Sequence, residues 1–250
     1  MASVALPTIK QEEWRYADFV ALERLDQRAF SEWQEVALAP GEVRRHAMVI
    51  GGDAPELHRI RITLAEGARA ELFVANVGDD YSRLEVVVRM GRGAHFEFGG
   101  VTIGGGTATR EFVTRIEHAE PEATSHQVVR AVHWGRATGN FLGRIDVARD
   151  AQKTDAAQDF KGLLLEKGAS ANARPELEIY ADDVKCAHGA AIGQLDEQAR
   201  FYMAARGLAP EAARKLLIRA FIADAFASLD DEVEQARLLD AVLTALGEAA

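Results

Sequence analysis

Short segments in which apolar and polar residues alternate run from about residue 43 to about residue 147. Neighbouring side chains of a strand point to opposite faces, so this alternation predicts β-strands with one buried face. The clearest segments are 58–64, 69–74, 83–89, 111–117, 127–133 and 140–147. No stretch with helical periodicity separates them, which argues against a βαβ layout. A sandwich, a barrel or a β-solenoid remains.

A loose internal repeat favours one of these folds. Gly67, Gly93, Glu122 and Asp150 each begin a new group of strands, each is followed by alanine, and they are separated by 26, 29 and 28 residues. Stacked coils produce self-similarity at such a period, because each coil buries its apolar face on the next. The glycine–alanine pairs suit corners where bulky side chains do not fit. We therefore predict a parallel β-helix, with a sandwich as the alternative.

Helical periodicity appears at both ends of the chain. Residues 8–36 are amphipathic, with Trp14 as a large apolar anchor. After residue 195 we predict three helices: 195–206 before Gly207, a second from Pro210, and a third over 230–246. The chain then divides into a helical segment of residues 1–40, a β-helix core of residues 41–195 and a helical subdomain of residues 196–250. The three C-terminal helices either cap the solenoid or form a docking module.

Composition excludes several classes of protein. The 250 residues are 48% hydrophobic and 27% charged, as in ordinary soluble domains, and the net charge is −10. This acidity argues against binding to nucleic acid or to anionic membranes. A single cysteine excludes an internal disulfide and fits a reducing compartment. No signal peptide or membrane-spanning run is visible, so we expect a cytoplasmic protein.

Familiar catalytic motifs are absent from the sequence. There is no nucleotide P-loop, no His-Glu-x-x-His motif and no Gly-x-Ser-x-Gly motif. Asp182 and Asp183 are adjacent, so in a strand they would face opposite sides, and a turn is the better interpretation. His95, His126 and His133 could converge in a stack of coils, although strand histidines are more often surface or core residues.

Cys186 and His188 are the candidates for chemistry. Their spacing of two residues places both side chains on one face if the segment is a strand. A thiolate beside an imidazole is half of a soft-metal or iron–sulfur site. No nearby residues supply the other half, and the inert role of a small buried hydrophobe remains open for Cys186.

The segment around this pair resembles the SufD family, which comprises iron–sulfur cluster assembly scaffold subunits of the SUF system. The resemblance is carried by Pro175-Glu-Leu-Glu-Ile179, Asp182-Asp-Val-Lys-Cys-Ala-His-Gly189 and Gly193-Gln-Leu-Asp196. The related SufB family lacks the central run in this form. Weaker similarities extend along most of the chain, in Glu12-Glu-Trp-Arg-Tyr16, Gln152-Lys-Thr-Asp155, Leu163-Leu-Leu165, Phe201-Tyr-Met-Ala-Ala-Arg-Gly207 and Ala213-Arg-Lys-Leu-Leu-Ile218.

The resemblance implies a fold and a role. The fold is mainly β, a right-handed parallel β-helix-like core with a short N-terminal helical segment and a C-terminal helical subdomain. The role is that of a non-catalytic partner of SufB, with both subunits docked on the SufC ATPase through C-terminal helices. In this chain the docking residues would be Phe201, Tyr202, Arg206 and Phe221.

The same resemblance implies a shared metal site. His188 would be a ligand to iron or to a nascent iron–sulfur cluster at the SufB interface, with Cys186 as the weaker second ligand. The partner would supply the other ligands, and this chain alone would hold no stable cofactor. The flavin associated with the family's complex has no visible motif here. Family members commonly have a longer N-terminal helical region, so functions that depend on it are not expected of this segment.

Two alternatives from other classes stay open. One is a β-helix enzyme, active on polysaccharides or as an acyltransferase with His188 as base, although neither hexapeptide repeats nor rows of aligned charged residues are found. The other is a homodimeric metal-binding module in which two copies of His188 meet across a two-fold axis.

Overall fold

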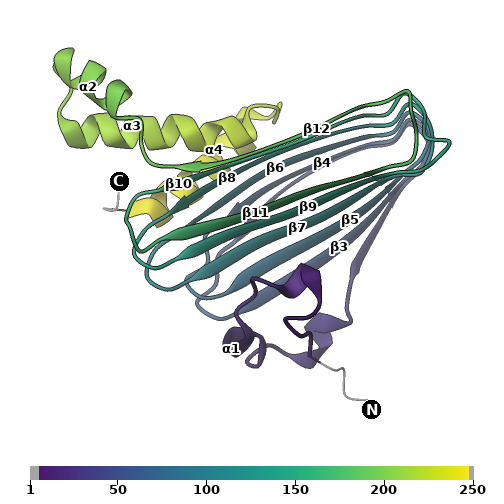
Figure 1. The fold of residues 1–250 in the computed structure, drawn as a ribbon, viewed down its shortest axis with the longest axis horizontal. Helices are drawn as coiled ribbons and strands as arrows, with labels where there is room; N and C mark the ends of the chain where they lie inside the picture. Colours follow the sequence, from purple (N-terminus) through teal and green to yellow (C-terminus); the bar gives the residue numbers. More distant parts are fainter. Residues whose placement is uncertain (1–5, 248–250) are drawn as a thin grey trace.

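The computed structural model describes residues 6–247, which form a β-solenoid of six coils (Figure 1). Each coil contributes one strand to each of two parallel six-stranded sheets, here called sheet A and sheet B. Sheet A contains β1 (Gln34–Leu38), β3 (Glu56–Leu64), β5 (Ser82–Met90), β7 (Thr109–His118), β9 (Thr138–Val147) and β11 (Ser170–Ile179). Sheet B contains β2 (Val43–Ile50), β4 (Arg69–Asn76), β6 (His95–Gly104), β8 (Thr124–His133), β10 (Asp155–Leu164) and β12 (Lys185–Gly193). The predicted parallel β-helix is confirmed, and the sandwich is wrong.

The main core fills the space between the two sheets. Alternate residues of every strand point inward, so the apolar positions of the sequence pattern meet in layers. Phe98 and Phe112 pack edge to face with ring centroids 5.5 Å apart, and Phe141 and Phe160 stack at 5.8 Å. The apolar residues at alternate positions of each strand, which the sequence predicted to be buried, form these stacked aromatic and aliphatic layers.

The repeat found in the sequence marks one corner of each coil. Gly67, Gly93 and Glu122 have positive φ angles of 65°, 61° and 65°, and each precedes a buried alanine. Glycine tolerates this left-handed conformation best, which explains two of the three residues. The fourth predicted start, Asp150, is wrong. Asp155 is the register partner of Thr124, so the residue that corresponds to Glu122, two positions earlier, is Lys153, and Lys153 also has a positive φ, of 60°.

The C-terminal helices are α2 (Glu197–Ala205), α3 (Pro210–Ala223), the 3-10 helix η3 (Asp224–Phe226) and α4 (Glu232–Leu246), which agree with the three predicted helices. Of these, α3, η3 and α4 cover the outer face of sheet B rather than the end of the solenoid, and α2 packs on α3 (Figure 1). A second apolar core joins α3, η3 and α4 to sheet B. Gly99 makes this approach possible, because a Cβ atom there would collide with the carbonyl oxygen of Ala225. The interpretation of the helices as an end cap is therefore wrong.

The N-terminal segment lies on the outer face of sheet A (Figure 1). It contains only short helical turns, η1 (Glu12–Trp14), α1 (Phe19–Leu22) and η2 (Gln27–Phe30), and β1 follows directly. The helical character expected for this segment is confirmed, but continuous helix over residues 8–36 is wrong. Asp18 and Asp26 cap new turns with their carboxylates, so the chain restarts instead of extending one helix. The buried Trp14 is the anchor that the sequence predicted.

Candidate metal-ligand and docking site

Cys186 and His188 lie in β12, the edge strand of sheet B. Their register partners in β10 are Ala156 and Gln158, so both side chains lie on one face of the strand, as their spacing predicted, and this face points toward the interior of the solenoid. Among the described residues, β12 has a strand neighbour on one side only, and the same holds for β11 in sheet A. The pair therefore sits at the open end of the stack of coils.

The two side chains differ in accessibility. His188 is exposed, whereas Cys186 is half-buried against the core. Burial, together with the nearby Asp155 carboxylate, raises the pKa of the Cys186 thiol, while a backbone hydrogen bond involving Ala156 partly opposes the shift. Imidazole is thus the more available ligand. Within residues 6–247 no group of three or more histidine, cysteine, aspartate or glutamate side chains is arranged to hold a metal ion, so the pair remains a half-site.

The other candidate histidines do not form a site with one another. His95 and His126 do meet, on the outer face of sheet B, where their ring nitrogens lie 3.5 Å and 3.2 Å from carboxylate oxygens of Glu97. Ser228, in the turn before α4, donates to the same carboxylate at 2.7 Å. Burial raises the pKa of Glu97, but hydrogen bonds from His126, His95 and Ser228 outweigh it and lower the pKa to about 2. This cluster ties the C-terminal helical layer to the sheet.

His133 lies on the opposite face of sheet B and is fully buried inside the solenoid. Its convergence with His95 and His126, considered from the sequence, is therefore wrong. Asp182 and Asp183 lie in the corner before β12, where the backbone of Asp183 accepts from the Lys153 N–H at 2.6 Å and donates to Gln152 at 2.9 Å. The interpretation of these carboxylates as turn residues is confirmed.

The predicted docking residues fall into two groups. Phe201 and Tyr202 of α2 are 77% and 60% exposed, and Arg206 is exposed beside the Tyr202 ring. No residue of α2 is buried, and the helix projects beyond the sheet (Figure 1). Phe221, in contrast, is half-buried against sheet B, with the Arg130 guanidinium 6.0 Å from its ring centroid, so it anchors α3 to the sheet.

An apolar groove extends this surface toward the open end of the solenoid. It has a volume of about 360 Å³ and lies between α3 and the ends of β10 and β12. Ile192, which lines this groove, is 46% exposed. Sequence reasoning missed this groove, because its walls come from three segments that are 28 and 21 residues apart in the chain (191−163 and 217−196). The lining residues include Lys161, Leu163, Ala191, Ile192, Leu195, Leu217 and Phe221.

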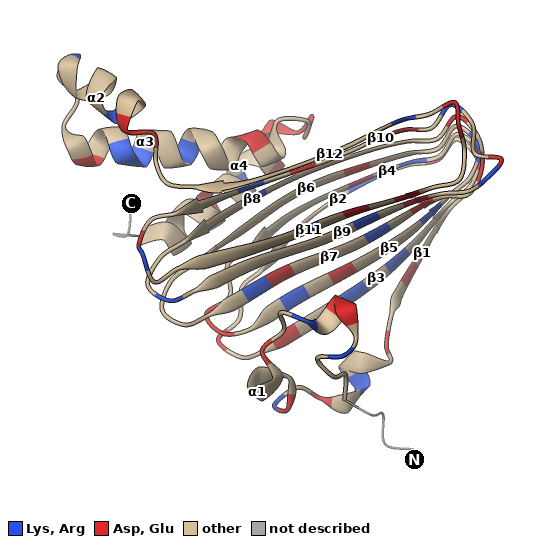
Figure 2. Ribbon diagram, in the orientation of Figure 1, with Lys and Arg blue, Asp and Glu red and all other residues tan. Residues whose placement is uncertain are grey.

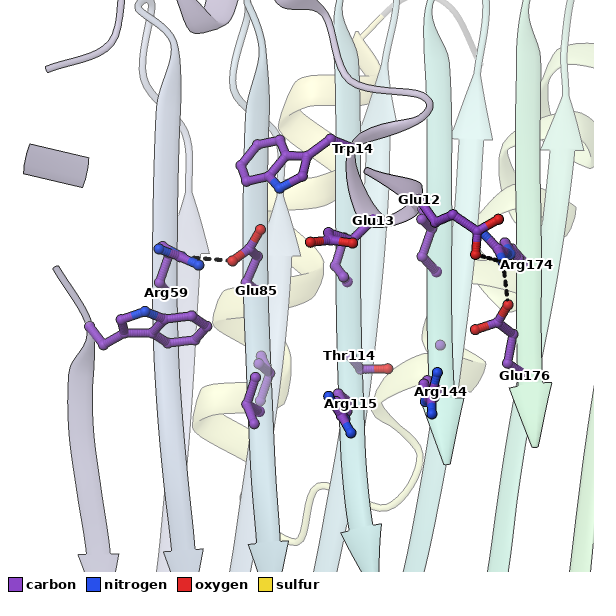
Figure 3. A pocket seen from close by; sticks show the side chains of 16 residues that line it. Glu12, Glu13, Trp14, Arg59, Glu85, Thr114, Arg115, Arg144, Arg174 and Glu176 are labelled. Atoms are coloured by element: carbon purple, nitrogen blue, oxygen red, sulfur yellow. Dashed lines mark hydrogen bonds and ion pairs between the residues drawn. The ribbon is translucent and has the colours of Figure 1, made fainter. Parts of the chain in front are cut away.

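A second groove, of about 350 Å³, lies on the outer face of sheet A beneath the N-terminal segment (Figure 3). Arginine and glutamate alternate across its floor, as they do over much of this face (Figure 2). Arg59 pairs with Glu85 at 2.6 Å, and Arg174 pairs with both Glu12 and Glu176 at 2.5 Å. Its lining includes four arginines and four glutamates but no cysteine or histidine, so it offers neither net charge nor soft metal ligands.

Comparisons with known proteins agree on one family. The model described as "SUF system FeS cluster assembly, SufBD core domain" matches residues 31–221. The iron–sulfur cluster assembly protein SufD of Escherichia coli K12 is 39% identical over 119 residues, which cover 48% of this chain and 28% of that protein. A SufBD family protein of Synechocystis is 33% identical over 171 residues, covering 68% of this chain and 38% of the relative.

The SufD protein of Bacillus subtilis is 29% identical over 152 residues, which cover 61% of this chain and 35% of that relative. The chain thus matches well under half the length of each of these relatives. Within residues 6–247 no helix combines the length and apolar character that crossing a membrane requires.

Proposed function

This chain belongs to the SufBD family of iron–sulfur cluster assembly proteins, and from that premise we propose that it is a non-catalytic scaffold subunit of the SUF system. It pairs with a SufB-type subunit, docks on a SufC-type ATPase and contributes ligands to a nascent cluster at the shared interface. It works in the cytoplasm. The observation that carries the proposal is that His188 and Cys186 lie together at the open end of the solenoid.

His188 is the principal ligand in this proposal. Its imidazole is exposed and needs no movement of the backbone to reach an incoming iron atom. Cys186 is the second ligand. A thiol must lose its proton before it binds a metal, and burial raises the pKa of the Cys186 thiol, which disfavours this loss. The cluster is cargo rather than a resident cofactor, and the missing ligands come from the partner subunit.

Pairing with a related solenoid uses the unpaired edges of β11 and β12. Both sheets end at the same coil, so each presents a row of backbone N–H and C=O groups there. Addition of a partner's strands at such an edge satisfies these groups and covers the half-buried interior of the last coil. The same contact brings partner side chains next to His188.

Docking on the ATPase uses the helical subdomain of residues 196–250. Two aromatic side chains, Phe201 and Tyr202, project from a helix with no buried residue, and an apolar groove continues the surface. Exposed aromatic residues beside a groove are typical binding hot spots. Phe221 of α3 lines this groove and also packs against sheet B. A partner bound at α2 is therefore connected to the solenoid through α3.

The test is co-expression with the SufB-type and SufC-type proteins of the same organism, followed by anaerobic analysis of iron and sulfide in the purified complex. We expect His188→Ala to leave the complex intact and to lower cluster-bound iron on the order of tenfold. His46→Ala is the matched control, because His46 is an exposed histidine on β2, the edge strand at the opposite end of sheet B from β12. Equal iron in both variants would refute the ligand role.

The docking surface is tested separately. Phe201→Ala combined with Tyr202→Ala should weaken binding to the ATPase subunit while the melting temperature of the isolated chain stays unchanged. Retained binding would place the interface elsewhere. A chain that forms only a homodimer and no mixed complex would favour the module in which two copies of His188 meet.

A further inference from the structure

At one level of the stack, the inward positions of the second and third coils are apolar, whereas each of the last three coils contributes a polar side chain. On sheet B, the inward residues in register are His46 on the first coil, then Leu72, Phe98, Gln127, Gln158 and His188, so the column is apolar in the second and third coils and polar from there to the open end at β12. On sheet A the corresponding order is Ile60, Val86, Thr114, Gly143 and Pro175. The polar residues therefore form one column that leads inward from His188.

Several polar atoms of these buried residues have no hydrogen-bond partner in the part of the chain that the structure describes. Thr114, Gln127 and Gln158 are each at most 2% exposed. Within residues 6–247, the hydroxyl of Thr114, both polar atoms of the Gln127 amide and the Oε1 atom of Gln158 have no hydrogen-bond partner. Protein interiors rarely leave such atoms unpaired, because each one costs the free energy of its lost contact with water.

Gln158 spans the interior between the sheets. Its Nε2 donates to the carbonyl oxygens of Gly143 and Glu176 at 3.3 Å and 3.4 Å, which are long hydrogen bonds. A Cβ atom at Gly143 would collide with Oε1 of Gln158, so the absence of a side chain at residue 143 leaves room for the amide.

The unpaired atoms define the chemistry of a ligand. An amide and a hydroxyl offer both donors and acceptors, and none of these groups carries a charge. A small neutral molecule that donates and accepts hydrogen bonds satisfies them, and neither an anion nor a metal ion does. Buried polar sites of this kind usually hold water with about three hydrogen bonds per molecule.

We propose that ordered water occupies the column between Thr114, Gln127 and Gln158, and that Gln158 is a positioning residue for His188. The water bound at Oε1 of Gln158 lies beside the His188 imidazole and hydrogen-bonds its inward ring nitrogen. The other ring nitrogen then faces the open end. Partners of this kind fix the tautomer and orientation of histidine ligands. The orientation of His188 matters for function only if His188 is a ligand, as proposed above, whereas the water site does not depend on that role.

The water site is tested by a crystal structure of the isolated chain at a resolution that shows ordered solvent. We expect water within about 3 Å of the Thr114 hydroxyl and of the Gln127 amide. Absence of density there would refute the proposal. Thr114→Val should remove this water and lower the melting temperature by about 2–4 °C. A higher melting temperature would mean that the column is dry and also refutes it.

Thr102→Val is the matched control for that substitution. Thr102 is equally buried in the same interior, but its hydroxyl already has a protein partner, Nε2 of His133 at 3.1 Å. Its replacement should lower the melting temperature without changing the water near Thr114.

The positioning role is tested by the tautomer of His188, read from the nitrogen chemical shifts of its ring in the neutral, metal-free chain. Gln158→Leu should change the ratio of the two tautomers about threefold or more, and Thr102→Val should not. An unchanged ratio in Gln158→Leu would refute the positioning role. Neither measurement uses iron or a partner, so a failure here is distinct from a failure of the proposed function, which the iron content of His188→Ala decides.

Discussion

Two buried histidines should make this protein acid-sensitive well above the pH at which its carboxylates titrate. His118 and His133 point into the solenoid and are 0% exposed. Burial lowers the pKa of His118 to about 4, although a backbone hydrogen bond with Ala123 opposes the shift. Burial, aided by the positive charge of Arg110, lowers the pKa of His133 to about 3. In the unfolded chain both imidazoles regain a pKa near about 6.5.

The sign of the effect follows from proton binding. As the pH falls below about 6.5, the unfolded chain takes up protons on these histidines and the folded chain does not, so the free energy of unfolding decreases. Each histidine contributes a slope of about 1.4 kcal/mol per pH unit in this range. Between about pH 7 and about pH 5 the loss is about 2 kcal/mol for each histidine and about 4 kcal/mol for both.

One group acts in the opposite direction. A hydrogen bond to Glu97 raises the pKa of His126 despite partial burial, so this histidine adds stability as the pH falls through its folded pKa. The pKa of Glu97 is lowered to about 2, so its contribution is lost only in stronger acid. The net loss near about pH 5 is therefore somewhat smaller than the sum for the two buried histidines.

The assay is urea unfolding followed by tryptophan fluorescence at about pH 7 and about pH 5, in the wild type and in His118→Gln. Glutamine is neutral at both values, so the variant should lose about 2 kcal/mol less than the wild type on acidification. His46→Gln, which replaces an exposed histidine, should behave as the wild type. An equal loss in His118→Gln and in the wild type would refute the assignment of acid sensitivity to the buried imidazoles.

Other substitutions probe the packing of the two outer layers. Gly99→Val should destabilise the chain by about 2–3 kcal/mol in urea unfolding, because its side chain meets the Ala225 carbonyl, whereas Gly193→Val, which has open space around it, should be neutral. Trp14→Ala should cost about 3–5 kcal/mol in the same assay, because the ring is buried against the Arg83 guanidinium and sheet A, and a small loss would show that the N-terminal segment does not anchor the fold. Phe201→Ala should change the free energy of unfolding by less than about 0.5 kcal/mol, and a larger loss would mean that α2 packs on the body.

Local sequence pattern was sufficient for most strands of the first five coils, for the C-terminal helices and for much of the core, but not for the N-terminal segment, where β1 lies partly inside the predicted helix. The alternation that predicted strands also assigns faces, because residues an even number apart in one strand share a side. Phe96 and Phe98 are buried together for this reason, and His126 and His133, seven residues apart in β8, lie on opposite faces. The end of α2 near Gly207 and the start of α3 at Pro210 were equally readable, because capping and proline geometry are local.

Contacts between side chains of different coils could not be predicted from local sequence pattern. The meeting of His95, His126 and Glu97 depends on the register of β6 against β8, which are about 29 residues apart. The corner from Val147 to Lys153 is two residues longer than the corner from His118 to Glu122 (153−147 against 122−118), and this displaced the predicted fourth repeat, because an insertion in a loop changes the period without changing the strands. Long-range register is set by the stacking of whole coils, and no local pattern records it.

The sequence by itself determined that the C-terminal helices have apolar stripes and that Cys186 and His188 share one face of a strand. Only the tertiary structure decided what those surfaces meet. The helices cover sheet B because Phe73, Val101 and Val132 make its outer face apolar, whereas sheet A is lined with paired charges. His188 is accessible because β12 has a neighbour on one side only among residues 6–247. An edge is a property of the whole stack of coils, since it exists only where the next coil is missing.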